Sequence, residues 1–210
     1  MKLNRGSRRK RNRSLSAGKI IIISGPSGVG KSTLIRELAR RISAKISVSV
    51  TTRSPGISEK NGADYHFVSK NIFEDLIKEN KLLEYTEYLG NYYGTPLDPV
   101  RDILNSGKDV ILGIEARGAK EVAKKFPDAI IICLCPPSDR ELARRIKARG
   151  RDDEPAIQKR IENAKKELEL ARNSGIYKHW VINDDLDQTV DELVKICKQE
   201  SNKNDRSPER

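Results

Sequence analysis

An apolar run that leads directly into a glycine-rich loop is the feature of this 210-residue sequence that most restricts its fold. Residues 20–23 are all isoleucine, and residues 25–32 read G-P-S-G-V-G-K-S. Glycines let the backbone curl with its N–H groups pointing inward, so such a loop forms an anion site at the N-terminus of the helix that follows. The spacing G-x-x-x-x-G-K-S is that of a phosphate-binding loop, which predicts an α/β fold with a buried strand before the loop.

The segments on either side of the loop fit this prediction. Residues 19–23 form a short β-branched run, and the apolar residues of 33–42 recur at helical spacing. In such a loop the lysine reaches the β- and γ-phosphates and the next hydroxyl coordinates Mg²⁺, which assigns these roles to Lys31 and Ser32. The predicted ATP-binding residues are Gly25, Pro26, Ser27, Gly28, Val29, Gly30, Lys31, Ser32 and Thr33.

Length and composition predict a soluble protein with one main domain. The chain is long enough for one α/β core with small inserted lobes. No apolar run approaches the roughly 20 residues that span a bilayer, and the N-terminus lacks the apolar stretch of a secretory signal. The three cysteines lack the C-x-x-C spacing of a zinc site. We therefore expect a cytoplasmic protein that does not bind membranes.

Much of the net charge of +11 lies at the N-terminus, where residues 1–16 include seven lysines and arginines and no acidic residue. A like-charged polar stretch cannot bury a core, so residues 1–17 are expected to form a disordered basic arm. A globular domain over 18–200 and a polar tail over 201–210 follow. Weak, nonspecific contact with RNA is compatible with such an arm because lysine and arginine neutralise phosphates whatever the sequence, whereas specific nucleic-acid recognition is not expected.

Apolar runs and helix signals alternate after the first helix. This pattern predicts a three-layer α/β fold in which helices cover a parallel core sheet. The runs are 46–50, 110–114, 129–134 and 180–182. Helix starts are predicted from the pairs Asn71 and Glu74, Asp98 and Pro99, and Ser138 and Glu141, and the last of these helices is expected to end at Gly150.

Two segments depart from the alternation. Residues 51–96 are rich in tyrosine, asparagine, glycine and charge around short strand-like pieces, which indicates an inserted lobe. Residues 147–155 form a charged turn between two helices, a composition typical of a mobile lid. We find no internal repeat.

Several separated motifs, in order, resemble those of guanylate kinases over residues 18–200. The motifs are S-V-T-T-R-S-P (49–55), N-G-A-D-Y-H-F (61–67), G-N-Y-Y-G-T (90–95), P-P-S (136–138), R-G (149–150) and V-I-N-D-D (181–185). The resemblance implies transfer of the γ-phosphoryl group of ATP to GMP with Mg²⁺, giving ADP and GDP. It also implies a GMP-binding lobe over 49–97 and a lid region over 139–160.

Basic residues and tyrosines are assigned by the resemblance to the two phosphate sites. Arg145, Arg149 and Arg160, in the lid and its flanking helices, are expected to act with Lys31 on the transferring phosphoryl group. The acceptor phosphate is expected to contact Arg53, Tyr65 and Tyr93. A guanidinium contacts two phosphate oxygens at once, whereas a tyrosine hydroxyl donates one directional bond without adding charge.

The remaining GMP-binding residues are expected to recognise the base. Glu84 suits guanine because a carboxylate accepts from both N1–H and the exocyclic amine, a donor pair that adenine lacks. Ser49 and Thr95 are expected to donate to O6, and Glu115 to serve either the guanine or the metal. Leaving such buried groups unpaired is costly, so AMP should be rejected. Tyr92 is expected only to pack the lobe.

Three positions differ from the family pattern. Gly56 stands where a second arginine is usual, Gly113 where a carboxylate near Mg²⁺ and its waters is usual, and Arg117 where glutamine is usual. Loss of a charge-assisted bond of about 1.5–3 kcal/mol corresponds to roughly 10- to 150-fold in binding or rate. The sequence therefore predicts a working but slower or higher-KM kinase.

Two other interpretations remain open from the sequence. A related kinase with a phosphorylated ribose as acceptor would resemble this family, although Glu84, Ser49 and Thr95 would then have no base to bind. A noncatalytic protein-interaction module is the other alternative, although such modules commonly lose the phosphate-binding loop, which is complete here. Binding of ATP distinguishes the module from the two enzymes.

Overall fold

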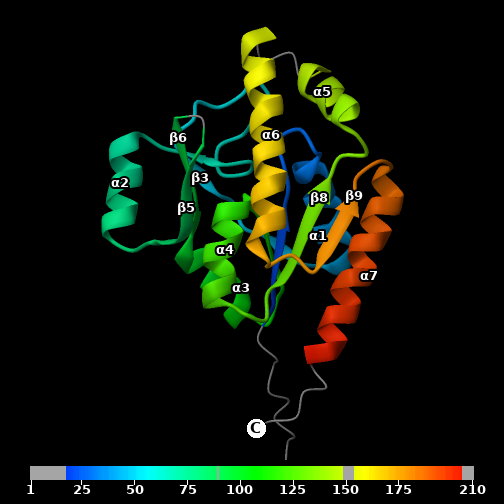
Figure 1. Ribbon diagram of the computed structural model, residues 1–210. Helices are drawn as coiled ribbons and strands as arrows, with labels where there is room; N and C mark the ends of the chain where they lie inside the picture. The colour runs from blue at the N-terminus through cyan, green and yellow to red at the C-terminus, as the bar shows by residue number, and fades with distance from the viewer. Residues whose placement is uncertain (1–17, 89, 149–153, 205–210) are drawn as a thin grey trace, which may run out of the picture.

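The isoleucines of the apolar run form the central strand of a parallel sheet in a computed structural model that describes residues 18–88, 90–148 and 154–204 (Figure 1). The sheet has five strands in the order β2-β7-β1-β8-β9, and its paired strands run parallel. Their bounds are β1 Ile20–Ser24, β2 Lys45–Ile46, β7 Val110–Gly113, β8 Ile130–Cys135 and β9 His179–Ile182. The phosphate-binding loop thus follows the middle strand of the sheet.

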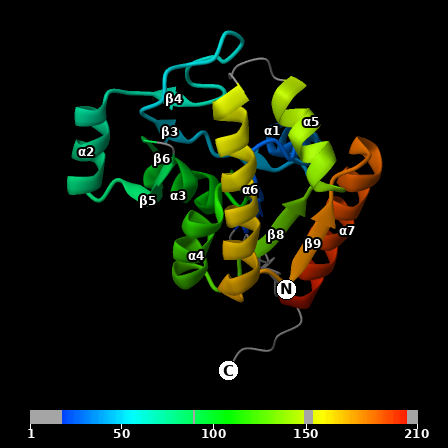
Figure 2. The same cartoon turned by 45° about the horizontal axis from the view of Figure 1, so that its top comes forward.

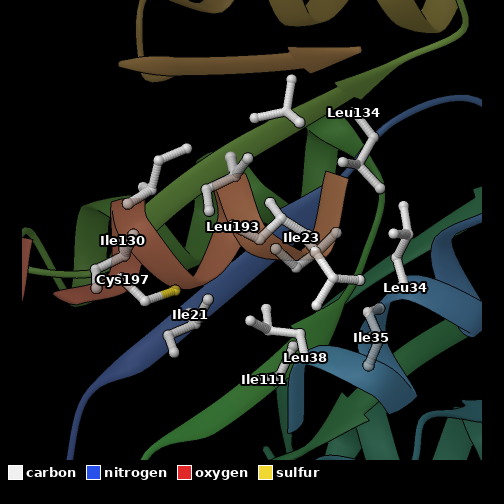
Figure 3. Packing of buried hydrophobic residues seen from close by; sticks show 14 of the residues in the cluster. Ile21, Ile23, Leu34, Ile35, Leu38, Ile111, Ile130, Leu134, Leu193 and Cys197 are labelled. Carbon is white, nitrogen blue, oxygen red and sulfur yellow. The ribbon is translucent and has the colours of Figure 1, made fainter. Parts of the chain in front are cut away.

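Helices cover both faces of this sheet, because all five residues of β1 are buried and successive side chains of a strand point to opposite faces. Ile21 and Ile23 pack with α1 (Lys31–Ile42) and α7 (Leu186–Asn204), as Figure 3 shows. Ile20 and Ile22 pack with the helices of the opposite face. These helices are α3 Leu97–Asn105, α4 Ala116–Lys125 and α6 Glu154–Ser174. The predicted three-layer α/β fold is confirmed.

A second, four-stranded sheet in the order β4-β3-β6-β5 lies to one side of the core (Figures 1 and 2). Its strands are β3 Val50–Thr51, β4 His66–Phe67, β5 Leu82–Tyr88 and β6 Asn91–Pro96. Helix α2 (Lys70–Lys78) contributes the wholly buried Phe73, whose ring stacks on Tyr92 at 5.3 Å between centroids. The packing role expected of Tyr92 is confirmed. We refer to these strands and α2 as the lobe.

The apolar run 46–50 is not the single strand that the sequence predicts. Lys45–Ile46 is the edge strand of the core sheet, whereas Val50–Thr51 pairs within the lobe. The chain therefore leaves one sheet and enters the other within three residues. A local apolar pattern cannot register this change because it carries no information about the pairing partner.

The helix ends match the predictions unevenly. The cap of α2 is Ser69, whose hydroxyl accepts from the Ile72 N–H at 3.3 Å, so the predicted capping pair at Asn71 is wrong. Ser138 does cap α5 (Asp139–Ala148), accepting from the Glu141 N–H at 3.1 Å.

At the chain ends, α7 continues through residue 204, so the first four residues of the predicted polar tail are helical. The expected basic arm, the predicted helix end at Gly150 and the rest of the tail lie outside the described residues. Within the described residues, no helix combines the length and apolar character needed to cross a membrane.

Candidate active site

A cavity of about 430 Å³ lies between the phosphate-binding loop and the lobe. On the core side it is lined by Pro26, Ser27, Gly28, Gly30, Lys31, Ser32, Gly113, Ile114, Glu115 and Arg160. On the lobe side it is lined by Ser49, Arg53, Gly56, Glu59, Tyr65, Glu84, Thr86, Tyr88, Asn91, Tyr93 and Gly94. Most residues assigned from the sequence to ATP and to GMP therefore line one cavity. Gly25, Val29, Thr33, Thr95 and Arg145 are not among its lining residues.

The loop is held in its curled form by glycine conformations and by a contact from β9. Gly30 has a φ of 101°, and a Cβ there would lie 2.5 Å from Asn183 Nδ2. Asn183, directly after β9, donates to the Val29 carbonyl at 2.6 Å. The buried Asn183 amide thus fixes the loop where α1 begins, a role that the sequence motif V-I-N-D-D does not reveal by itself.

Cationic side chains surround the loop. The Lys31 ammonium donates to the Gly25 carbonyl and, at 3.5 Å, to the Pro26 carbonyl. Arg160 reaches from α6 to donate to the Ser27 hydroxyl at 2.9 Å. Positive charge from α1 and α6 therefore meets at one place, beside the backbone of the loop.

Arg145 contacts the backbone of the same loop from outside the cavity. Its guanidinium bonds Glu141 at 2.7 Å and donates to the Asn183 carbonyl at 2.9 Å and the Val29 carbonyl at 3.5 Å. It touches the loop backbone without lining the cavity. Arg149 lies outside the described residues.

The lobe side brings together Arg53, Tyr65 and Tyr93. The Arg53 guanidinium lies 5.5 Å from the centroid of the Tyr65 ring, which is 6.1 Å from that of Tyr93. Glu59 accepts two hydrogen bonds from Arg53, at 2.9 and 3.1 Å. The three predicted acceptor-phosphate residues are therefore adjacent, and Arg53 is held by a carboxylate whose contact the sequence did not predict.

Glu84 is 6% exposed, and two elements hold its carboxylate. The Thr95 hydroxyl donates to one carboxylate oxygen at 2.6 Å. On α4, a Cβ at Gly118 would lie 2.2 Å from the other oxygen, so the backbone of α4 abuts the carboxylate. Burial raises the pKa of Glu84 to about 7, and the Thr95 bond and the charge of Lys125 oppose this rise.

Two further buried carboxyl groups, Glu115 and Glu167, lie near the Lys31 ammonium beside the loop. Burial and the charge of Glu167 raise the pKa of Glu115 to about 7, and the Lys31 ammonium opposes the rise. The pKa of Glu167 itself is raised by burial, and Lys31 opposes this rise as well. Tyr88 lies beside Glu167, and each of the two side chains shifts the pKa of the other. The sequence analysis missed both groups, although Glu167 follows Arg160 by seven residues and so lies on the same face of α6.

Comparison with known proteins identifies the family of this chain. The family model described as guanylate kinase matches residues 17–200. The chain belongs to the guanylate kinase family. The guanylate kinase of Lactobacillus johnsonii is 45% identical over 185 residues, which cover 87% of this chain and 89% of that protein. The guanylate kinase of Synechocystis sp. is 45% identical over 184 residues, which cover 87% of this chain and 95% of that protein.

A solved guanylate kinase structure supports the same family. The crystal structure of guanylate kinase from Anaplasma phagocytophilum superposes with a TM-score of 0.73 at 30% identity, covering 88% of this chain and 87% of that one. A gluconokinase from Sinorhizobium meliloti has a TM-score of 0.52 at 17% identity, covering 92% of this chain and 99% of that one. The second likeness concerns the fold alone.

The departures from the guanylate kinase pattern have distinct places in the structure. Gly56 lines the cavity, and its N–H donates to Glu59 at 2.6 Å. Gly113 ends β7, where a Cβ would lie 2.6 Å from Ile35 Cδ1. Arg117 is exposed on α4 and is not among the lining residues. Arg117 is therefore poorly placed to replace the arginine missing at position 56.

Proposed function

We propose that this chain transfers the γ-phosphoryl group of ATP to GMP, giving ADP and GDP. The observation that carries the proposal is a single cavity with a phosphate-binding loop on one wall and Arg53, Tyr65, Tyr93 and Glu84 on the other. Phosphoryl transfer needs two nucleotides in line, exclusion of water and positive charge around the transferring group. One wall supplies the ATP site and the other the acceptor site.

Each group has a proposed task. The loop amides and Lys31 bind the ATP phosphates, and Arg160, Arg145 and Arg149 stabilise the charge of the transferring phosphoryl group. Arg53 with the two tyrosines holds the phosphate of GMP. Glu84 accepts the N1–H and amine protons of guanine, and Ser49 donates to O6. Thr95, which the sequence also directed at O6, instead donates its hydroxyl proton to Glu84 and so holds that carboxylate.

A magnesium ion fits the oxygen donors of the cavity. Ser32 and Glu115 line it beside Lys31, and hydroxyl and carboxylate oxygens are the ligands that Mg²⁺ prefers. Among the described residues, no three His, Cys, Asp or Glu side chains form a dedicated metal site, which suits an ion carried mainly by the phosphates of the nucleotide. When bound, the ion neutralises charge on the transferring phosphates.

The test is a coupled ADP-release assay with GMP, dGMP, AMP and UMP as acceptors. We expect turnover with GMP and dGMP, and a loss of about 100-fold or more in Lys31→Ala because a donor to the transferring phosphates is removed. Absent turnover with GMP, or equal turnover with all acceptors, would contradict the proposal. If GMP is not turned over, calorimetric titration with ATP separates the two alternatives. A kinase for another acceptor binds ATP, whereas a noncatalytic interaction module does not.

A further inference from the structure

Strand β5 changes register next to the predicted guanine-binding residue. Leu82 pairs with Pro96 and Glu84 with Thr95, so Leu83 is an extra residue opposite a single step of β6. Such a bulge bends the strand, redirects a neighbouring side chain and removes backbone groups from the ladder. The direction of the Glu84 side chain therefore depends on how the bulge is held.

Helix α4 supplies the contact that holds the bulge. The Lys125 ammonium donates to the Leu83 carbonyl at 2.5 Å. Leu83 is 1% exposed, and a buried carbonyl outside the ladder is costly unless it finds a donor. The same helix abuts the Glu84 carboxylate at Gly118. Two contacts from one helix thus act on consecutive residues of β5.

The charge of Lys125 also acts on Glu84. Burial raises the pKa of this carboxyl group, and Lys125 is the cation that opposes the rise, together with the Thr95 hydrogen bond. Glu115 also lines the cavity, and the charge of Glu84 disfavours the ionisation of Glu115. Lys125 therefore favours the ionised carboxylate that guanine needs.

We infer that Lys125 is a positioning residue for guanine recognition: through the Leu83 carbonyl and its positive charge, it keeps the Glu84 carboxylate directed into the cavity and ionised. The inference rests on the proposed function, because it takes Glu84 to contact guanine. Lys125 itself is not among the residues that line the cavity.

The test compares Lys125→Met, Lys125→Gln and Lys125→Arg with Lys124→Met. Lys124 is the adjacent lysine, with 62% of its side chain exposed and an ion pair to Glu121, so its loss removes one charge from α4 without touching β5. For Lys125→Met we expect KM for GMP to rise about 5- to 20-fold with kcat and KM for ATP little changed, since a partly exposed charge-assisted bond is lost. Lys125→Arg should restore most of the affinity.

The pH profile of kcat/KM for GMP provides the readout that a merely structural contact would not move. In Lys125→Met and Lys125→Gln the lower inflection should shift to higher pH, because the ionised form of Glu84 has lost its cation. Thermal melting at pH 8 identifies any variant that fails to fold. If Lys125→Met fails to fold, Lys125→Gln, which keeps a hydrogen-bond donor but loses the charge, is compared with the wild type in its place.

Two results overturn the inference: an unchanged KM and pH profile in both neutral Lys125 variants, or the same change in Lys124→Met. A wild-type protein without GMP kinase activity would instead contradict the proposed function. The two failures are therefore distinguishable.

Discussion

On the lobe side of the cavity, Glu59 holds both Arg53 and the backbone at Gly56. Glu59 accepts both hydrogen bonds from Arg53 and a third from the Gly56 N–H. In the family pattern an arginine side chain stands at position 56, where it would add a second positive charge. In this chain Arg53 bonds the Glu59 carboxylate, and under the proposed function the same guanidinium also holds the acceptor phosphate.

Gly56→Arg is therefore expected to raise kcat/KM for GMP by about 10-fold or more, because a charge-assisted bond to phosphate is added. Gly56 is not among the described glycines with positive φ, so an arginine can adopt its backbone conformation. Steady-state kinetics with GMP at fixed ATP make the measurement.

The matched control is Ile57→Arg, because Ile57 is fully exposed and the new charge would lie outside the cavity. An equal gain in the control would assign the effect to general electrostatic attraction. No gain in Gly56→Arg would mean that another group already fills the role.

At the scale of elements, the end of β7 is packed as a glycine site. Ile35 of α1 occupies the space that a side chain at Gly113 would need, with its Cδ1 atom 2.6 Å from the position of a Cβ. The contacting atom is the far end of a flexible side chain. The packing of α1 against the sheet therefore fills the space that a carboxylate side chain at position 113 would occupy.

Restoring that carboxylate should need a change on α1. Gly113→Asp alone is expected to lower the free energy of unfolding by about 1–3 kcal/mol, because the core is overpacked. With Ile35→Val the strain should fall, and kcat at limiting Mg²⁺ should rise about 10-fold, as expected for a group that orients metal-bound water. Urea unfolding and magnesium titrations of both variants, with Ile35→Val as reference, make the measurement, and equal stability of the single and double variants would contradict it.

Elements with strong local patterns were predictable from the sequence. The strand β1, the loop and α1 follow from periodicity and glycine spacing, and most residues that line the cavity were named from the loop and the family resemblance. Contacts that depend on pairing were not predictable, because neither the bulge at Leu83 nor its partner Lys125 has a local signal. The splitting of the run 46–50 between two sheets has the same cause.

For the whole molecule, burial of Glu84 and Glu115 links stability to pH. The pKa of each is raised to about 7 in the fold from an ordinary value of 4.5. A raised carboxyl pKa contributes stability that is fully present below about pH 4.5 and is lost as pH rises through about 7. The folded protein should therefore become less stable between pH 5 and about pH 8.

Glu84→Gln is expected to remove part of this loss while weakening GMP binding. A shift of this size corresponds to an effect on the order of 3 kcal/mol, or several degrees in Tm, above pH 8. Differential scanning fluorimetry from pH 5 to 9 should show the variant melting higher at pH 8.5 and together with wild type at pH 5. Glu87→Gln, an exposed position on the same strand, is the control, and parallel curves for Glu84→Gln and wild type would contradict the prediction.

The contacts of α4 with β5 restrict how the lobe can rotate relative to the core. In the order β4-β3-β6-β5, the strand that carries Glu84 is the edge strand that packs against α4, whereas Arg53 and Tyr65 flank the two strands at the other edge of the lobe sheet. A rotation that preserves the contacts of Lys125 and Gly118 has β5 as its axis. Under the proposed function, such a rotation would leave the guanine site at Glu84 nearly in place while Arg53 and Tyr65 carry the GMP phosphate towards the phosphate-binding loop.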